Sequence, residues 1–111
     1  MPRPPKVKRG RKPRGFPSSV QVFGHKVKVV YCHVMPKTST DSFGVTYFDT
    51  KRIYISLEQP KEEMEQTLFH ELCHMVLFLS GHCWKMTEND EEAVVRAFEH
   101  GLYPLYKRRR L

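Results

Sequence analysis

Five consecutive residues, His70-Glu71-Leu72-Cys73-His74, have the types and the spacing of a zinc site. Histidines four positions apart on a helix lie one turn apart on the same face, close enough to bind one zinc ion. The ion lowers the pKa of a bound water to about 7. A glutamate beside the first histidine takes the proton, and the hydroxide attacks a polarised carbonyl. We predict that His70 and His74 bind zinc and that Glu71 is the catalytic base.

A catalytic zinc also needs a third protein ligand and an open position. The second helix expected after the motif begins with Asp90, Glu91 and Glu92, and each of them is a candidate ligand. The competing interpretation is a helix whose histidines point to solvent or into a satisfied core. The intact spacing, on a segment with strong helical character, favours the metal site.

Strands are expected in the chain before this motif. Apolar residues alternate over residues 20–30, which predicts one or two strands with a turn or bulge at Gly24. Residues 45–57 predict a hairpin, with strands at 45–48 and 52–57, because they are rich in the β-branched and aromatic side chains that strands favour.

Two helices are expected to follow the strands. The first begins at Pro60, a residue that the first helical turn tolerates, and ends at Ser80 before Gly81. The second covers about 90–103, and Pro104 ends or bends it. We therefore predict an α+β fold in which a small antiparallel sheet precedes an active-site helix and a second helix carrying a glutamate ligand.

The stretch TLFHELCH, preceded by RIYIS and followed by EEAVVRAFEHGLYPL, resembles the small gluzincin-like peptidases of the ImmA/IrrE type and their phage-encoded relatives. The resemblance covers roughly residues 45–106 and implies a third zinc ligand, a glutamate, on the second helix. Glu92 fits the spacing of that pattern, and Glu91 fits nearly as well, so Glu92 is favoured and Glu91 stays the alternative. Glu99 departs from the pattern, since relatives usually carry a small residue there.

The net charge of +7 is concentrated at the two ends of the chain. Residues 1–17 hold seven Lys and Arg and no acidic residue, and Lys107 begins a second basic run. We expect a disordered N-terminal tail over 1–17, one domain over 18–106 and a basic C-terminal tail over 107–111.

The N-terminal run contains Arg9-Gly10-Arg11, which is similar to an AT-hook. In such a hook the two guanidinium groups lie in a narrow A·T minor groove, and the glycine permits close approach. The competing interpretation is a polybasic segment that binds phosphates without sequence preference. Both interpretations make nucleic acid a candidate partner through Arg9 and Arg11.

Three cysteines, with no apolar stretch after the basic N-terminus, predict free thiols in the cytoplasm (the host cytoplasm if the protein is phage-encoded) and no membrane partner. Cys32-His33 and His82-Cys83 are a second candidate zinc site, although adjacent ligand pairs are poor zinc-finger geometry. Cys73 faces away from the two histidines by helix geometry and is expected in the core.

The sequence thus predicts a zinc metallopeptidase that hydrolyses peptide bonds of a protein substrate. The alternative is a non-catalytic nucleic-acid-binding or regulatory protein whose zinc site is structural or vestigial. A donor that stabilises the transition state is also expected. Tyr54, Tyr103 and His82 are possible, and the sequence does not choose among them.

Overall fold

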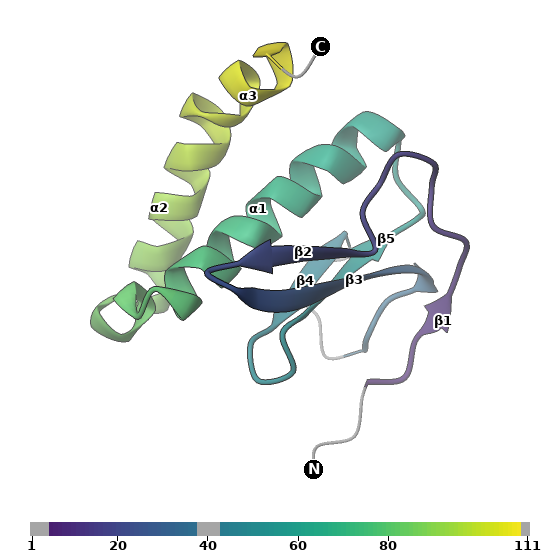
Figure 1. Ribbon diagram of the computed structural model, residues 1–111, viewed down its shortest axis with the longest axis horizontal. Helices are drawn as coiled ribbons and strands as arrows, with labels where there is room; N and C mark the ends of the chain where they lie inside the picture. The colour runs from purple at the N-terminus through teal and green to yellow at the C-terminus, as the bar shows by residue number, and fades with distance from the viewer. Residues whose placement is uncertain (1–4, 38–42, 110–111) are drawn as a thin grey trace.

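The computed structural model describes residues 5–37 and 43–109, with only the backbone described at Cys83, Trp84, Tyr106, Arg108 and Arg109. Five strands form one sheet, α1 packs across one of its faces, and α2 packs against α1 (Figure 1). The elements are β1 Lys8–Arg9, β2 Ser19–Val22, β3 His25–Val34, β4 Gly44–Tyr47, β5 Arg52–Ser56, α1 Lys61–Leu79, η1 His82–Lys85, α2 Glu88–Gly101 and α3 Tyr103–Arg109. The predicted α+β class is confirmed.

The sheet is mixed, which corrects the expected antiparallel arrangement. Its order is β1-β3-β5-β4, with β2 also paired to β3. β3 and β5 run parallel, whereas the other pairs are antiparallel. The β4–β5 hairpin lies where the sequence predicted it, and β5 rather than β4 pairs with β3. After β3 the chain first forms β4 at the edge of the sheet, and β5 then fills the position between β4 and β3.

The β2–β3 turn confirms the expected break at Gly24. Phe23 and Gly24 have φ values of 50° and 79°, so the two-residue connection has positive φ at both positions. That geometry matches the twist of the flanking strands, and glycine adopts it without cost. The turn sets the register in which Val22 pairs with His25.

The main core lies between the sheet and α1. Strand residues such as Val27 and Ile53 meet helix residues such as Leu68 and Met75, and all four are buried. A smaller cluster around Tyr54 lies on the opposite face of the sheet. Alternate residues of β3 and β5 therefore enter different clusters, as strand geometry requires.

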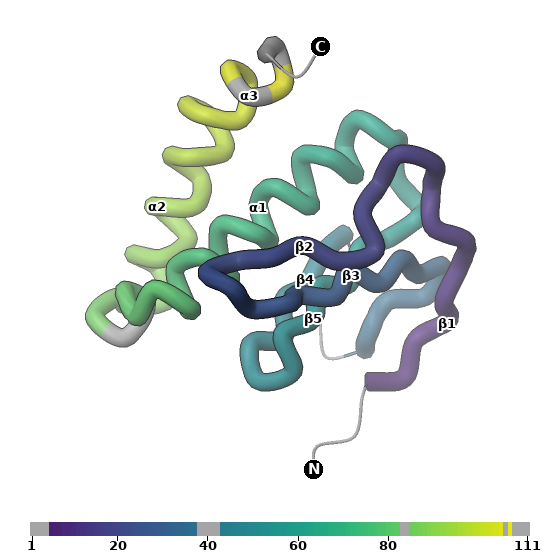
Figure 2. Tube along the Cα trace, viewed as in Figure 1, coloured from purple at the N-terminus to yellow at the C-terminus, as the bar shows by residue number. Residues whose placement is uncertain are grey.

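The expectation of a disordered segment over residues 1–17 is wrong for residues 5–17. Lys8 and Arg9 form β1 against β3, and the Gly10 amide donates to the Tyr31 carbonyl over 2.9 Å. Phe16 is buried in the main core, where its ring meets that of Tyr31 edge-on. Figure 2 shows this segment passing around the edge of the sheet before β2 begins. Burial of Phe16 and the hydrogen bonds to β3 together hold this basic stretch on the domain.

Both predicted helices are present, and their bounds lie close to those predicted from the sequence. α1 ends one residue before Ser80, and Gly81 follows with a φ of 83°, as the predicted stop requires. α2 begins at Glu88, earlier than expected, because the Thr87 hydroxyl caps it by accepting from the Asp90 amide over 3.1 Å. The chain continues as α3 to Arg109, so the expected C-terminal tail is helical over residues 107–109. Residues 110–111 lie outside the described part.

Candidate metal centre

The two histidines of the motif point the same way from α1. His70 and His74 lie one turn apart, and their Nε2 atoms are 3.3 Å from each other. Both side chains are largely buried between α1 and α2. The helix that holds them is anchored in the core by Leu68 and Met75 on its sheet-facing side. The predicted spacing therefore produces a pair of converging imidazoles.

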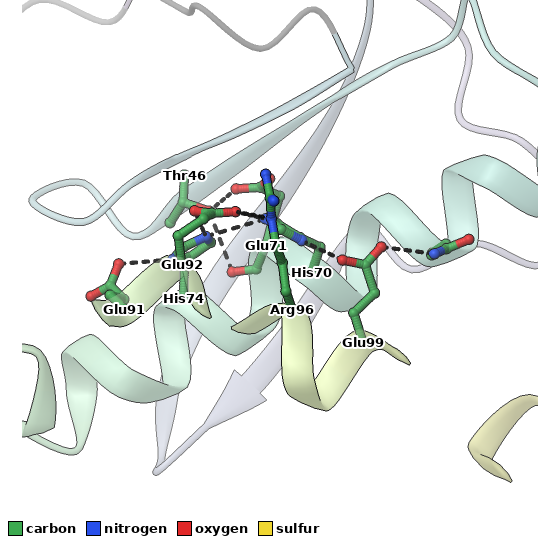
Figure 3. Close-up of polar contacts among 9 residues, drawn as sticks. Thr46, His70, Glu71, His74, Glu91, Glu92, Arg96 and Glu99 are labelled. Carbon is green, nitrogen blue, oxygen red and sulfur yellow. Dashed lines mark hydrogen bonds and ion pairs between the residues drawn. The ribbon is translucent and has the colours of Figure 1, made fainter. Parts of the chain in front are cut away.

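Glu92 completes a three-residue donor group from α2 (Figure 3). Its Oε1 lies 3.0 Å from His70 Nε2, and its Oε2 lies 3.2 Å from His74 Nε2. Four-coordinate zinc with bonds of about 2.0–2.1 Å separates neighbouring ligand atoms by about 3.3–3.4 Å. Within the described residues this is the one group of three or more donors that could hold a metal ion. The spacing fits a divalent cation.

Two further carboxylates each bind the far side of one imidazole. Glu99 lies 2.8 Å from His70 Nδ1, and Glu91 lies 2.8 Å from His74 Nδ1. An ionised carboxylate only accepts, so each Nδ1 carries the hydrogen and donates it. In a neutral imidazole this leaves a lone pair on Nε2. Both lone pairs then face each other and the Glu92 oxygens, an arrangement that needs a cation or a proton among them.

The charges around the histidines also favour a cation. Burial alone would lower the pKa of His70, but the hydrogen bond to Glu99 and the negative charges of Glu71, Glu99 and Glu92 outweigh it, so the pKa is raised. Arg96 is the one basic side chain that forms an ion pair with the described carboxylates here, with its Nε 3.8 Å from Glu92. The negative charges that favour the protonated imidazole also favour a divalent cation at this position.

Glu71 lies next to this donor group but is turned toward the sheet. Its side chain is 5% exposed, and its Oε1 accepts from the Thr46 hydroxyl of β4 over 2.7 Å. Gly44 permits this close approach, since a Cβ there would lie 2.5 Å from Thr67 Cγ2 and 3.2 Å from Glu71 Cγ. β4 therefore fixes the carboxylate that the sequence predicts as the base.

The rival cysteine–histidine site finds no support in the described residues. Cys32 is fully buried in the smaller cluster, where burial raises the pKa of its thiol. His33 is exposed and pairs with Glu58. The ring of His82 binds the Ser80 hydroxyl, and the side chain of Cys83 lies outside the described part.

Cys73 points away from the histidines, as predicted, but it is only half-buried and belongs to neither core cluster. It lines an apolar groove between α1, α2 and the segment before β2, with Leu72 and Phe98 among the other lining residues. Burial, reinforced by the charge of Glu99, raises the pKa of its thiol to about 11. A thiol that stays protonated is a poor metal ligand.

In the part of the chain that the structure describes, the contacts of the three candidate transition-state donors lie outside the donor group. Tyr54 is buried on the face of the sheet opposite α1. The ring of Tyr103 packs against that of Phe69 and lines the apolar groove. His82 lies in η1 and pairs with Ser80.

The predicted nucleic-acid residues lie away from the donor group. Arg9 is in β1, which the sheet order places at the end opposite β4, and Arg11 is exposed just after it. A Cβ at Gly10 would clash with Leu57 Cδ1 and lie 2.6 Å from His33 Nε2. Packing against the protein itself thus explains this glycine, which the AT-hook interpretation assigned to a minor groove.

An α+β domain whose central helix presents two histidines to a glutamate of the next helix belongs to the class of zincin-like proteins. The family model Peptidase_M78, described as the IrrE N-terminal-like domain, matches residues 24–98. The chain therefore belongs to this family of zinc-dependent peptidases and their relatives. No curated protein and no solved structure matches it. In the described part, no helix is long and apolar enough to cross a membrane.

Proposed function

We propose that the protein is a zinc metallopeptidase that hydrolyses peptide bonds of a protein substrate. His70, His74 and Glu92 would hold the metal. The observation that carries the proposal is the convergence of three electron-pair donors, each imidazole fixed by a carboxylate behind it, next to a buried glutamate. Such carboxylate–histidine–metal arrangements fix the imidazole orientation and raise its basicity.

Each carboxylate of the centre has its own task in this proposal. Zinc, when bound, supplies Lewis-acid activation of a water and of the scissile carbonyl. Glu71 accepts the proton of the attacking water at its carboxylate and passes it to the leaving amine. Thr46 orients Glu71, because its hydroxyl donates a hydrogen bond to one oxygen of the carboxylate. Glu91 and Glu99 orient the ligands and do not bind the metal.

The position of β4 also suits a peptide substrate. β4 is the last strand in the sheet order, and its Thr46 contacts the proposed base. Extended peptides bind sheet edges through main-chain hydrogen bonds. A peptide lying along β4 would pass beside Glu71, which supports hydrolysis of a peptide bond.

Zinc analysis and peptide hydrolysis by matched variants test the proposal. Wild type and Glu71→Gln should each contain about one zinc per chain, whereas His70→Ala should lose it. Glu71→Gln should hydrolyse a peptide library about 10²–10⁴-fold more slowly. Glu63→Gln is the control, because Glu63 is an exposed carboxylate of the same helix.

Three results would count against the proposal. Equal zinc in wild type and His70→Ala would overturn the metal site. Undiminished hydrolysis by Glu71→Gln would overturn the assignment of the base. Stoichiometric zinc without hydrolysis of any peptide by wild type would favour the alternative function, a regulatory protein with a structural zinc.

A further inference from the structure

The charges of the chain are divided between its two layers. Residues 1–57, which form the sheet, hold twelve Lys and Arg and two acidic residues. Residues 58–106, which include α1 and α2, hold three Lys and Arg and ten acidic residues. The sheet is therefore basic and the helices α1 and α2 are acidic, while α3 contains the basic run that begins at Lys107.

Strand register gathers several of these cations on the face of the sheet opposite α1, called here the outer face. Val27 and Val29 of β3 enter the core against α1, so the alternate residues Lys26 and Lys28 lie on the outer face. Lys28 pairs directly with Arg52 of β5. Tyr47 of β4 is the next residue across the sheet from Arg52.

Like charges in these positions cost stability. Neighbouring strands lie about 4.7–4.9 Å apart, so the paired residues Lys28 and Arg52 hold two like charges close together, where they repel. Lys26 and Lys28 are exposed, and Arg52 is partly exposed. Among the described residues, none of these three takes part in an ion pair. A ligand with closely spaced negative charges would offset that cost.

Arg9 extends the outer face at the other end of the sheet. It pairs with Cys32, whose side chain belongs to the cluster on this face. Tyr47 is half-buried, and its ring packs edge-to-face against that of Tyr54. Its ring could stack on an unpaired base, as aromatic residues within basic grooves do.

We propose that the outer face binds nucleic acid, with Arg9, Lys26, Lys28 and Arg52 contacting the phosphate backbone. This surface lies on a different side of the sheet from the metal centre, so the proposal does not depend on the peptidase function. The acidic helices α1 and α2 repel phosphates, which favours binding of the nucleic acid on the sheet. The cations are fixed by strand pairing, whereas an AT-hook requires a segment free to enter a minor groove.

Fluorescence anisotropy of the full-length chain with labelled duplex DNA and single-stranded RNA tests the proposal. The double variant Lys28→Gln/Arg52→Gln removes two cations of the outer face. The control Lys61→Gln/Lys85→Gln removes two exposed cations of the helical layer and gives the same net charge. Thermal unfolding and zinc content of each variant verify that the fold is kept.

The outer-face variant should bind duplex DNA on the order of 60-fold more weakly than wild type at about 0.1 M salt. Each phosphate contact contributes about 0.9 to the slope of log affinity against log salt, and this contribution vanishes at about 1 M. That slope should fall by about 2. The control should bind like wild type. Equal weakening of both variants would overturn the proposal in favour of net charge alone. Binding of wild type to anionic phosphatidylserine vesicles and to neither nucleic acid would overturn it in favour of a membrane surface.

Discussion

Replacing Glu99 with glutamine should weaken metal binding although Glu99 does not belong to the donor group. Glu99 accepts from His70 Nδ1 and also from the Gln66 side chain, each over 2.8 Å, and is largely buried. Glutamine keeps the size of the side chain and one accepting oxygen, so the fold should persist. What is lost is one negative charge behind a ligand.

The magnitude follows from the path between Glu99 and the metal. The 2.8 Å hydrogen bond, the width of the imidazole ring and a bond of about 2.1 Å place the charge roughly 7 Å from the ion. A unit charge and a divalent ion at that distance attract by about 1 kcal/mol at a dielectric constant of 80 and about 5 kcal/mol at 20. Removing such partners costs typically 10–100-fold in affinity, or about 1.4–2.7 kcal/mol, which lies between these limits.

Competition with a chromophoric zinc chelator measures the effect. The control is Glu88→Gln, because Glu88 is an exposed carboxylate of the same helix. Glu91→Gln should behave like Glu99→Gln, since Glu91 accepts from His74 Nδ1 over the same distance. If Glu99→Gln binds zinc as tightly as Glu88→Gln, the carboxylate behind His70 does not tune the site, and the reasoning is refuted.

Three other predictions concern stability and catalysis. Phe16→Ala should lower the free energy of unfolding by about 3 kcal/mol, and unchanged urea midpoints would show that the segment over residues 5–17 does not pack. Thr46→Val should lower kcat while zinc content stays the same, because Glu71 loses the donor that orients it; wild-type kcat would contradict this. Removing zinc with EDTA should lower the melting temperature, since zinc at a hundred times its Kd stabilises by about 2.7 kcal/mol; an unchanged temperature would mean that the metal does not bind the folded chain.

Local patterns were sufficient to predict the elements around the candidate site. The helical periodicity and Gly81 fixed α1, and Gly24 marked the β2–β3 turn, because each is a property of a few neighbouring residues. The pairing of β3 with β5 depends on contacts distant in sequence, which no local pattern encodes. A parallel pair among short, closely spaced strands was therefore missed.

The N-terminal segment was misjudged for a related reason. Its composition is typical of a disordered basic tail. Composition alone does not reveal that Phe16 packs against Tyr31. Phe16 packs on Tyr31, and the Tyr31 hydroxyl donates to the Pro17 carbonyl over 2.6 Å. Burial of one large side chain together with main-chain hydrogen bonds offsets the entropy of ordering the segment. Two apolar residues, Val7 and Phe16, were the only signals available in the sequence.

The two adjacent acids Glu91 and Glu92 show where sequence reasoning about the site ends. Successive residues on a helix point about 100° apart, so only one of the two can face a given point, and the sequence does not state how α2 crosses α1. In the structure Glu92 faces the Nε2 atoms, whereas Glu91 reaches the outer nitrogen of His74. Glu99, seven residues after Glu92, returns to the same face two turns later and reaches His70. Glu99, which departs from the family pattern, is thus the residue that orients the ligand His70. The helical periodicity that starts at Glu92 is the sequence signal that points to it.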